Sequence, residues 1–214
     1  MTPIVDEAEK SLKRERLIAA AAQVFAAKGY RKATMDEIAR LAGTAKGTVY
    51  LYFKDKESLF YAVFEWLASA SFENSTVIER NDLSAAQRLL ALAEATVVFM
   101  TEHREMFPLT LEVWAAAGST DSRERFATAM KDLYATYRLL IAEIIQNGQL
   151  RGELRSDLNA QALGSLLAGA VDGLLLQSWF DPDLNPLPLL RDFFDPLIRG
   201  MLTQPTETEP KEIN

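Results

Sequence analysis

The chain has 214 residues, of which 49 % are apolar, and it carries a net charge of −7. This length allows one large domain or two modest domains with a hydrophobic core. The absence of cysteine excludes disulfides, thiolate zinc sites and cysteine nucleophiles, and the single histidine, His103, argues against a histidine-rich metal site. The sequence therefore predicts no metal and no cofactor.

The N-terminus carries no basic region followed by an apolar one, so no signal peptide is expected. No uninterrupted apolar run approaches the roughly 18 residues of a membrane span. These features predict a cytoplasmic protein without a membrane partner.

The charges are distributed unevenly along the chain. Residues 10–56 hold eleven Lys and Arg against four Asp and Glu, which gives +7. Residues 1–9 carry −3, so residues 57–214 carry −11. A basic head on an acidic body suits a DNA-binding end, because affinity for DNA comes largely from neutralising phosphates.

The first elements in chain order are an arm and a helix. Residues 1–9 are acidic and unpatterned and are predicted to be disordered. A helix is predicted from Lys10 or Ser11 to Lys28, with apolar residues at helical spacing and Gly29 as its stop.

Two short helices joined by a tight turn are predicted next. Thr34 and Glu37 have the spacing of a capping box, and Gly43 supplies the left-handed residue that ends the first helix. The second helix, from about Ala45 to Phe53, is short and rich in exposed donors. A helix-turn-helix places such a helix in the major groove, with its N-terminal residues nearest the base edges.

The predicted DNA contacts fall into two groups. The base-reading residues are Thr44, Lys46, Gly47, Thr48 and Tyr50, and the phosphate-binding residues are Thr34, Tyr52, Lys54 and Lys56. Composition alone also allows an ordinary helical hairpin with a solvated basic face.

The segment K-G-T-V-Y-L-Y-F-K-D-K-E-S-L, preceded by R-E-R-L-I-A-A-A-A-Q-V-F-A-A-K-G-Y, resembles the DNA-binding module of the TetR family of bacterial regulators. The resemblance covers about the first sixty residues. The chain departs from the family pattern at Thr44, usually aliphatic, and at Ala45, usually a capping serine. Alanine is a poor N-cap, so Thr44 is the candidate cap one residue earlier.

The rest of the chain predicts an all-α fold with about nine helices, because no alternating β-branched runs or hairpin turns occur. Asp55 is expected to cap a helix to about Phe72, which would link head and body. Residues 74–82 read as irregular. Further helices are predicted over Ser84–His103, Glu105–Ala117, Asp121 or Ser122 to Asn147 with Gly148 as its stop, Asp157–Phe180, and Leu187–Leu202 with a kink or division at Pro196.

These helices are interpreted as an N-terminal three-helix DNA-binding domain, residues 10–54, and a ligand-binding and dimerisation bundle, residues 55–203. Residues 204–214 are predicted to be a disordered tail. The segments L-E-V-W-A-A-A and G-E-L-R-S-D-L loosely resemble the BetI-type branch of the family.

Aromatic and polar residues of the bundle are candidates for a ligand pocket, although aromatics at helical spacing equally fit a packed core. The resemblance favours a pocket, since family members commonly bind small, often apolar, effectors. The candidates are Trp66, Phe99, His103, Phe107, Trp114, Tyr137 and Asp172.

The last two helices are apolar on more than one face, which fits either a buried helix pair or a dimer interface. In the TetR family the last two helices usually dimerise. The candidate interface residues are Leu163, Leu166, Leu167, Ala170, Leu174, Phe193 and Leu197.

The leading interpretation is a homodimeric repressor, associated with the nucleoid when bound, that a small, largely apolar effector releases from a palindromic DNA operator. A constitutive or architectural DNA-binding protein with a solid core is the alternative. A helical enzyme or carrier fits poorly, because the chain has one histidine, no cysteine and no paired-carboxylate motif.

Overall fold

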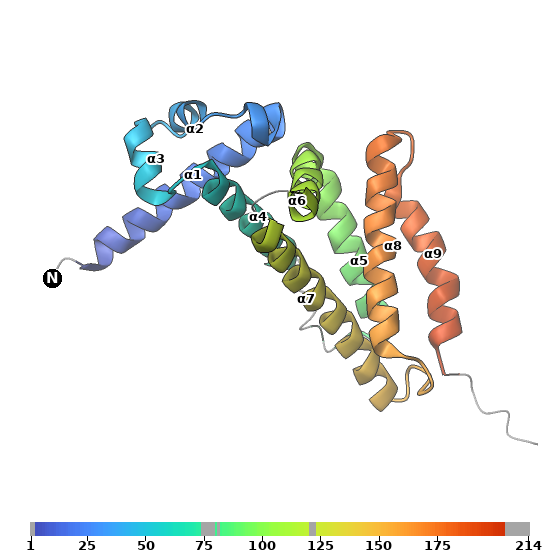
Figure 1. The fold of residues 1–214 in the computed structure, drawn as a ribbon. Helices are drawn as coiled ribbons and strands as arrows, with labels where there is room; N and C mark the ends of the chain where they lie inside the picture. Colours follow the sequence, from blue (N-terminus) through green and yellow to red (C-terminus); the bar gives the residue numbers. More distant parts are fainter. Residues whose placement is uncertain (1–2, 74–79, 81, 120–122, 204–214) are drawn as a thin grey trace, which may run out of the picture. The chain divides into compact units, whose positions relative to one another are not determined.

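The computed structural model describes residues 3–73, 80, 82–119 and 123–203, and most of these residues are helical (Figure 1). The helices are α1 (Pro3–Lys32), α2 (Met35–Leu41), α3 (Lys46–Tyr52), α4 (Lys56–Glu73), α5 (Ala85–Glu102), the 3-10 turn η2 (Arg104–Met106), α6 (Phe107–Ser119), α7 (Arg123–Leu150), α8 (Ala160–Phe180) and α9 (Pro186–Met201). Across these described ranges there is no β-strand, only an isolated bridge between Leu154 and Leu202. The predicted all-α fold with about nine helices is confirmed.

The N-terminal helix begins earlier than the sequence suggested. α1 starts at Pro3, so the expectation of a disordered arm over residues 1–9 is wrong from Pro3 onward. Proline is well tolerated in the first turn of a helix, and Glu7 and Glu9 suit the positive end of the helix dipole. An acidic stretch without an apolar pattern is therefore as consistent with the first turns of a helix as with a disordered arm.

The end of α7 also differs from expectation. Gly148 was expected to stop this helix, but α7 runs past it to Leu150, and Gly152, with φ of 71°, follows the helix. Gly148 instead makes room for close packing: a Cβ there would lie 2.5 Å from the Cβ of Ala85 and 2.9 Å from a methyl of Leu154. The glycine is needed for space rather than for helix termination.

Four smaller expectations are also revised or left open. The helix expected over Glu105–Ala117 is divided into η2 and α6, and Pro196 does not divide α9. The tail at residues 204–214 lies outside the described residues, as does most of the stretch 74–82.

The chain forms two compact units. The first comprises residues 1–75 with 98–133, and the second comprises residues 76–97 with 134–214. Helices α5 and α7 each pass from one unit into the other. The first unit therefore contains the predicted DNA-binding segment together with α6.

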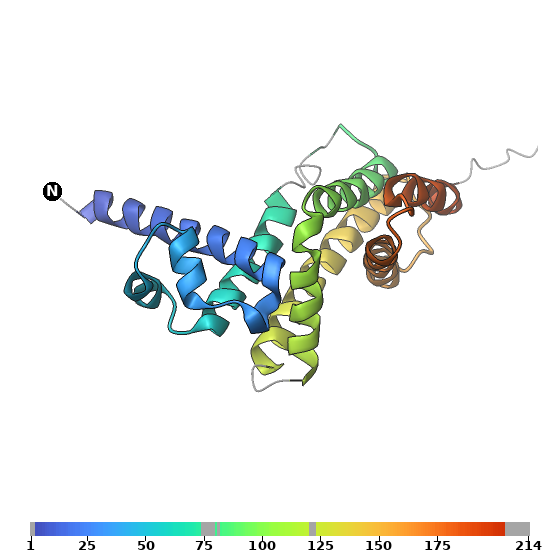
Figure 2. The same cartoon turned by 90° about the horizontal axis from the view of Figure 1, so that it is seen from above.

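Helices α1, α2 and α3 lie together in the view from above (Figure 2), and an aromatic cluster of α1, α4 and α7 side chains packs within the same unit. The ring of Phe60 on α4 lies 5.3 Å from that of Phe25, 4.7 Å from that of Tyr30 and 5.7 Å from that of Phe126. Phe25, Phe60 and Phe126 are buried. The cluster joins α4 to the end of α1 and to the start of α7.

In the second unit α8 packs against α7 and against α9, and α9 also contacts α5. Asn159 caps α8 by accepting a hydrogen bond from the Ala162 amide at 3.0 Å. Arg191 on α9 forms an ion pair with Glu94 on α5 at 2.6 Å. The buried residues of this unit include Ile144, Ile145, Leu154, Leu190 and Phe194.

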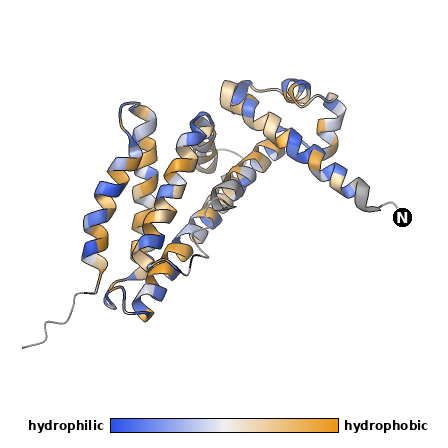
Figure 3. Ribbon diagram, turned by 180° about the vertical axis from the view of Figure 1, so that it is seen from behind, coloured by the Kyte–Doolittle hydropathy of each residue, from blue (hydrophilic) through white to orange (hydrophobic). Residues whose placement is uncertain are grey.

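Helix α8 is apolar over most of its length (Figure 3), and by length and composition it could cross a membrane. The expectation that no uninterrupted apolar run approaches 18 residues is not contradicted, because Gln161 and Asp172 interrupt this helix. Core helices of proteins that enter no membrane pass the same test, so it is weak evidence for insertion. Most of the apolar stretch is not buried within the chain.

We predict that Gly148→Ala lowers the free energy of unfolding by about 1–3 kcal/mol, because the added methyl group overpacks the contact with Ala85 and Leu154. Gly118→Ala, in α6, is the matched control, since a Cβ there meets no atom within 4 Å. Urea unfolding of both variants tests this. Equal midpoints would show that Gly148 is not needed for packing.

Candidate nucleic-acid interface

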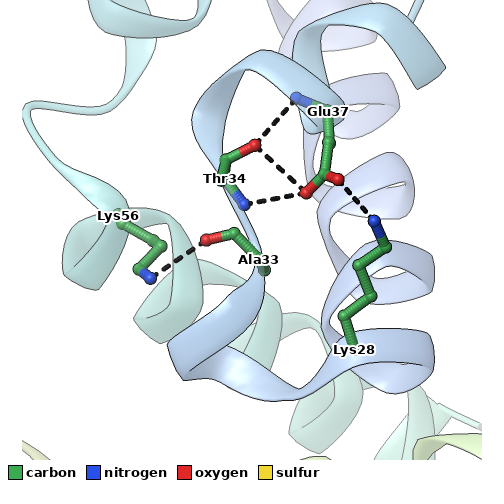
Figure 4. Close-up of polar contacts among 5 residues, drawn as sticks. All are labelled: Lys28, Ala33, Thr34, Glu37 and Lys56. Carbon is green, nitrogen blue, oxygen red and sulfur yellow. Dashed lines mark hydrogen bonds and ion pairs between the residues drawn. The ribbon is translucent and has the colours of Figure 1, made fainter.

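The first helix of the helix-turn-helix is held by the predicted capping box (Figure 4). The Glu37 amide donates to Thr34 Oγ1 at 3.3 Å, and the Thr34 amide donates to Glu37 Oε2 at 3.2 Å. Lys28 on α1 pairs with the other carboxylate oxygen of Glu37. Hydrogen bonds from Lys28 and Thr34 hold the pKa of Glu37 below its ordinary value. The start of α2 is thereby tied to α1.

The turn between α2 and α3 closes as predicted around Gly43. Gly43 has φ of 67°, its amide donates to Arg40 O at 3.2 Å, and the Thr44 amide donates to Ala39 O at 2.9 Å. These two bonds form a Schellman motif, which satisfies the last carbonyls of α2. A left-handed residue in this place favours glycine.

The start of α3 differs from one expectation. Its N-cap is Ala45, which makes no side-chain capping bond, and α3 begins at Lys46. The expectation that Thr44 takes over the capping role is therefore wrong, because the Schellman turn uses the Thr44 backbone and Ala45 follows in extended conformation. α3 retains the register that places Lys46 in its first turn.

Helix α3 buries one side and exposes the other. Val49 and the following Phe53 are buried. Of the predicted base-reading residues, Lys46, Gly47 and Tyr50 are exposed, whereas Thr44 and Thr48 are partly buried. Leu51 on the same helix is 83 % exposed, and an apolar side chain here could contact a thymine methyl group. Sequence reasoning missed Leu51 because an apolar residue in a short amphipathic helix is read as core.

Lys46 is paired in the free protein. Its Nζ lies 2.8 Å from Asp36 Oδ2 on α2, and this contact raises the pKa of Lys46 above its ordinary value. Both side chains are exposed, so separating the ion pair costs little free energy. Asp36 was not among the predicted site residues, although its place in the first turn of α2 puts it opposite the start of α3.

The predicted phosphate-binding residues differ in how they are placed. Lys54 is exposed and Tyr52 is partly buried. Lys56 is turned inward: its Nζ donates to Tyr30 O at 2.8 Å, to Ala33 O at 3.0 Å and to Arg31 O at 3.2 Å. An ammonium group has three protons, so these carbonyls match its donor capacity. Phosphate contact by Lys56 stays a prediction, but the geometry gives it an internal role.

The seven predicted pocket residues divide between the two units. In the first unit Phe99 and Phe107 are buried, and the His103 ring stacks on that of Phe99 at 4.5 Å. Trp66 and Trp114 belong to the same unit, Trp66 with an exposed side chain and Trp114 partly buried. In the second unit Tyr137 and Asp172 are both partly buried.

Asp172 accepts a hydrogen bond from the Tyr134 hydroxyl at 2.7 Å. Burial raises the pKa of Asp172, and burial together with this bond raises the pKa of Tyr134. A buried carboxylate most often has a cationic partner, but the partner of Asp172 found here is a neutral phenol. Elsewhere in the described ranges, no group of three His, Asp or Glu residues is arranged to hold a metal ion.

The predicted interface residues on α8 and α9 are unequally exposed. Leu166 is 70 % exposed and Phe193 is 47 % exposed, whereas Leu167 is buried within the chain. Leu163, Ala170, Leu174 and Leu197 are partly buried. Phe180 at the end of α8 is 72 % exposed and was not predicted.

Two short helices joined by a Schellman turn, with an exposed second helix carrying lysine, threonine and tyrosine, define a helix-turn-helix DNA-binding protein. The sequence family described as bacterial regulatory proteins, tetR family, matches residues 17–63. The family described as BetI-type transcriptional repressor, C-terminal, matches residues 85–202. The chain therefore belongs to the TetR family of transcriptional regulators, with a BetI-type C-terminal part.

Individual relatives agree with this assignment. The chain is 30 % identical over 176 residues to the transcriptional regulator SrpR of Pseudomonas putida, covering 80 % of this chain and 76 % of that protein. A Saccharomonospora viridis regulator solved with choline has the same fold, with 22 % identity, a TM-score of 0.77 and coverage of 91 % of this chain and all of the other. Bacillus subtilis FadR solved with stearoyl-CoA has a TM-score of 0.73 at 22 % identity, covering 87 % of this chain and 98 % of the other.

We predict that Lys46→Ala relaxes the preference for one base pair by ~1–3 kcal/mol, because a lysine that reads a guanine discriminates at that position. Lys54→Ala should instead weaken binding to all duplexes about equally and reduce the salt slope by about 1, as loss of one phosphate contact requires. Fluorescence anisotropy with single-base variants at several salt concentrations separates the two effects. Identical behaviour of the two variants would contradict these roles.

Proposed function

We propose that this protein is a homodimeric repressor in the cytoplasm, bound to a palindromic operator until a small, largely apolar effector releases it. The DNA-binding part of the proposal rests on the exposed surface of α3, where Lys46, Tyr50 and Leu51 are accessible to DNA. The family assignment supports the regulatory part.

The surface of α8 and α9 supports the dimer. On α8, residues 162, 166, 169, 173 and 180 share one side at helical spacing. A Cβ at Gly169 or Gly173 would meet no atom within 4 Å, so this side of the helix is open. An apolar surface with small residues permits close approach of a second helix. Covering it with the same surface of a second copy would give an isologous, two-fold interface.

A two-fold dimer carries two recognition helices in opposite directions. Helix-turn-helix dimers bind half-sites about one turn of DNA apart, roughly 34 Å, so the operator of such a dimer is a palindrome. The acidic residues outside the helix-turn-helix would disfavour binding of DNA elsewhere on the protein.

The effector class is inferred from the residues around the predicted pocket and from two neighbours. Within the second unit, the aromatic side chain of Tyr137 suits an apolar ligand, and Asp172 with Tyr134 would supply a polar end. The choline and the stearoyl-CoA bound to the two structural neighbours each combine an apolar part with a charged part. We propose an effector of that general character.

Helix α4 supplies the mechanism that we propose. Asp55 caps its start by accepting from the Ser58 amide at 2.7 Å, and Phe60 packs against the end of α1. An effector that binds one tilt of α4 more tightly than another would change the separation of the recognition helices. Only this differential affinity can drive release from DNA.

We predict that Leu166→Asp raises the dimer dissociation constant by at least ~100-fold, or about 3 kcal/mol, because a carboxylate would be buried without a partner. Leu139→Asp on α7 is the matched control, since Leu139 is 60 % exposed and lies outside α8 and α9. Sedimentation velocity over a range of concentrations measures both. A dimer that survives Leu166→Asp, or that Leu139→Asp disrupts equally, would refute this interface.

Selection from randomised duplex DNA tests the whole proposal. The purified protein is expected to recover a palindrome whose half-sites are separated by one helical turn. Addition of a true effector should then release the selected duplex. Recovery of no sequence by a folded, dimeric protein would refute the operator assignment.

A further inference from the structure

The end of α1 is bent at Gly29, where the backbone leaves helical geometry with φ of 75° and ψ of 159°. Because this ψ is extended, the peptide between Gly29 and Tyr30 is turned out of the helix direction. Its N–H, from Tyr30, donates to Glu112 Oε2 on α6 at 2.7 Å. A carboxylate 82 positions along the chain thus holds the bend.

The bend and the carboxylate fit each other closely. A Cβ on Gly29 would lie 2.9 Å from Glu112 Oε1, so any side chain at position 29 would push the carboxylate away. The positive φ of Gly29 also disfavours other residues. Position 29 therefore needs glycine for two reasons: its backbone has a positive φ, and a side chain there would collide with Glu112 on α6.

The residue held by Glu112 is in turn held from α4. Lys56 binds the Tyr30 carbonyl, and its Nζ lies 4.6 Å from the centre of the Tyr30 ring. Lys56 also binds the carbonyl of Ala33, which directly precedes Thr34, the cap of α2 (Figure 4). A continuous series of contacts therefore runs from α6 through Tyr30 and Lys56 to the start of the helix-turn-helix.

We infer that Glu112 is a positioning residue for DNA recognition: its carboxylate fixes the bend at Gly29 and so couples α6 to the helices that read DNA. Withdrawal of the carboxylate would free the Tyr30 peptide and loosen the bend from which the chain enters α2, although Lys28 and Lys56 would still hold the start of α2. The regulatory consequence, that α6 reports effector binding to the head by this route, rests on the proposed function. This route differs from a tilt of α4, because a change in α6 would act on α1 directly through Glu112.

Glu112→Ala tests the coupling, with Glu105→Ala on η2 as a control that removes an exposed carboxylate nearby. Amide hydrogen exchange of the full chain measures residues 30–34 in the free protein and α6 with and without the selected operator duplex. We expect Glu112→Ala to raise exchange over residues 30–34 by at least tenfold. Since coupling is reciprocal, operator binding should slow exchange in α6 of the wild type and of Glu105→Ala, but not of Glu112→Ala.

Glu112→Gln retains an oxygen that can accept from Tyr30 and should restore the response of α6 to DNA. If Glu112→Ala does not fold, Glu112→Asp replaces it, because it keeps the charge and shortens the reach. Faster exchange over residues 30–34 with an unchanged response of α6 would overturn the coupling. Equal behaviour of Glu112→Ala and Glu105→Ala would overturn the contact itself.

Failure of the proposed function gives a different result from failure of this inference. If selection recovers no operator, the regulator assignment fails, and exchange over residues 30–34 in the free protein still decides whether Glu112 holds the bend. A non-specific duplex at low salt then serves as the DNA probe for α6.

Discussion

The ammonium group of Lys56 at the end of α1 is the contact on which the DNA-binding helices depend. The last carbonyls of a helix have no partner within it, and a cation placed among them also opposes the helix dipole favourably. Lys56 meets this need for the carbonyls of Tyr30 and Arg31 and also binds that of Ala33, just after α1, and it does so from the first residue of α4. One side chain therefore joins α1, the approach to α2 and the start of α4.

The two units achieve stability in different ways. The first unit combines its aromatic cluster with polar contacts over long sequence separations, as between Lys28 and Glu37 or Tyr30 and Glu112. The second unit relies on apolar helix packing and leaves one side of α8 uncovered. A surface completed by its own contacts can present side chains to DNA, whereas the uncovered apolar surface of α8 is where we propose that a second copy binds.

Local signals in the sequence predicted those features whose cause is local. The Thr34 cap, the left-handed Gly43 and the Asp55 cap each depend on neighbours within a few residues. The inward Lys56 and the ion pair of Lys46 could not be predicted, since their partners lie ten or more residues away. Gly148 was misread because a glycine that allows close packing has the same sequence signature as one that ends a helix.

The pairing of Lys46 with Asp36 also bears on how fast the protein searches for its site. If Lys46 reads a base as proposed, its pairing with Asp36 would reduce its attraction for an arbitrary stretch of DNA, and encounters at wrong sequences would be shorter. Where a base edge can accept a hydrogen bond from the Lys46 ammonium group, the exposed Lys46–Asp36 ion pair can separate at small cost in free energy. On the proposed role of Lys46, the carboxylate of Asp36 would shorten the residence time on competing DNA.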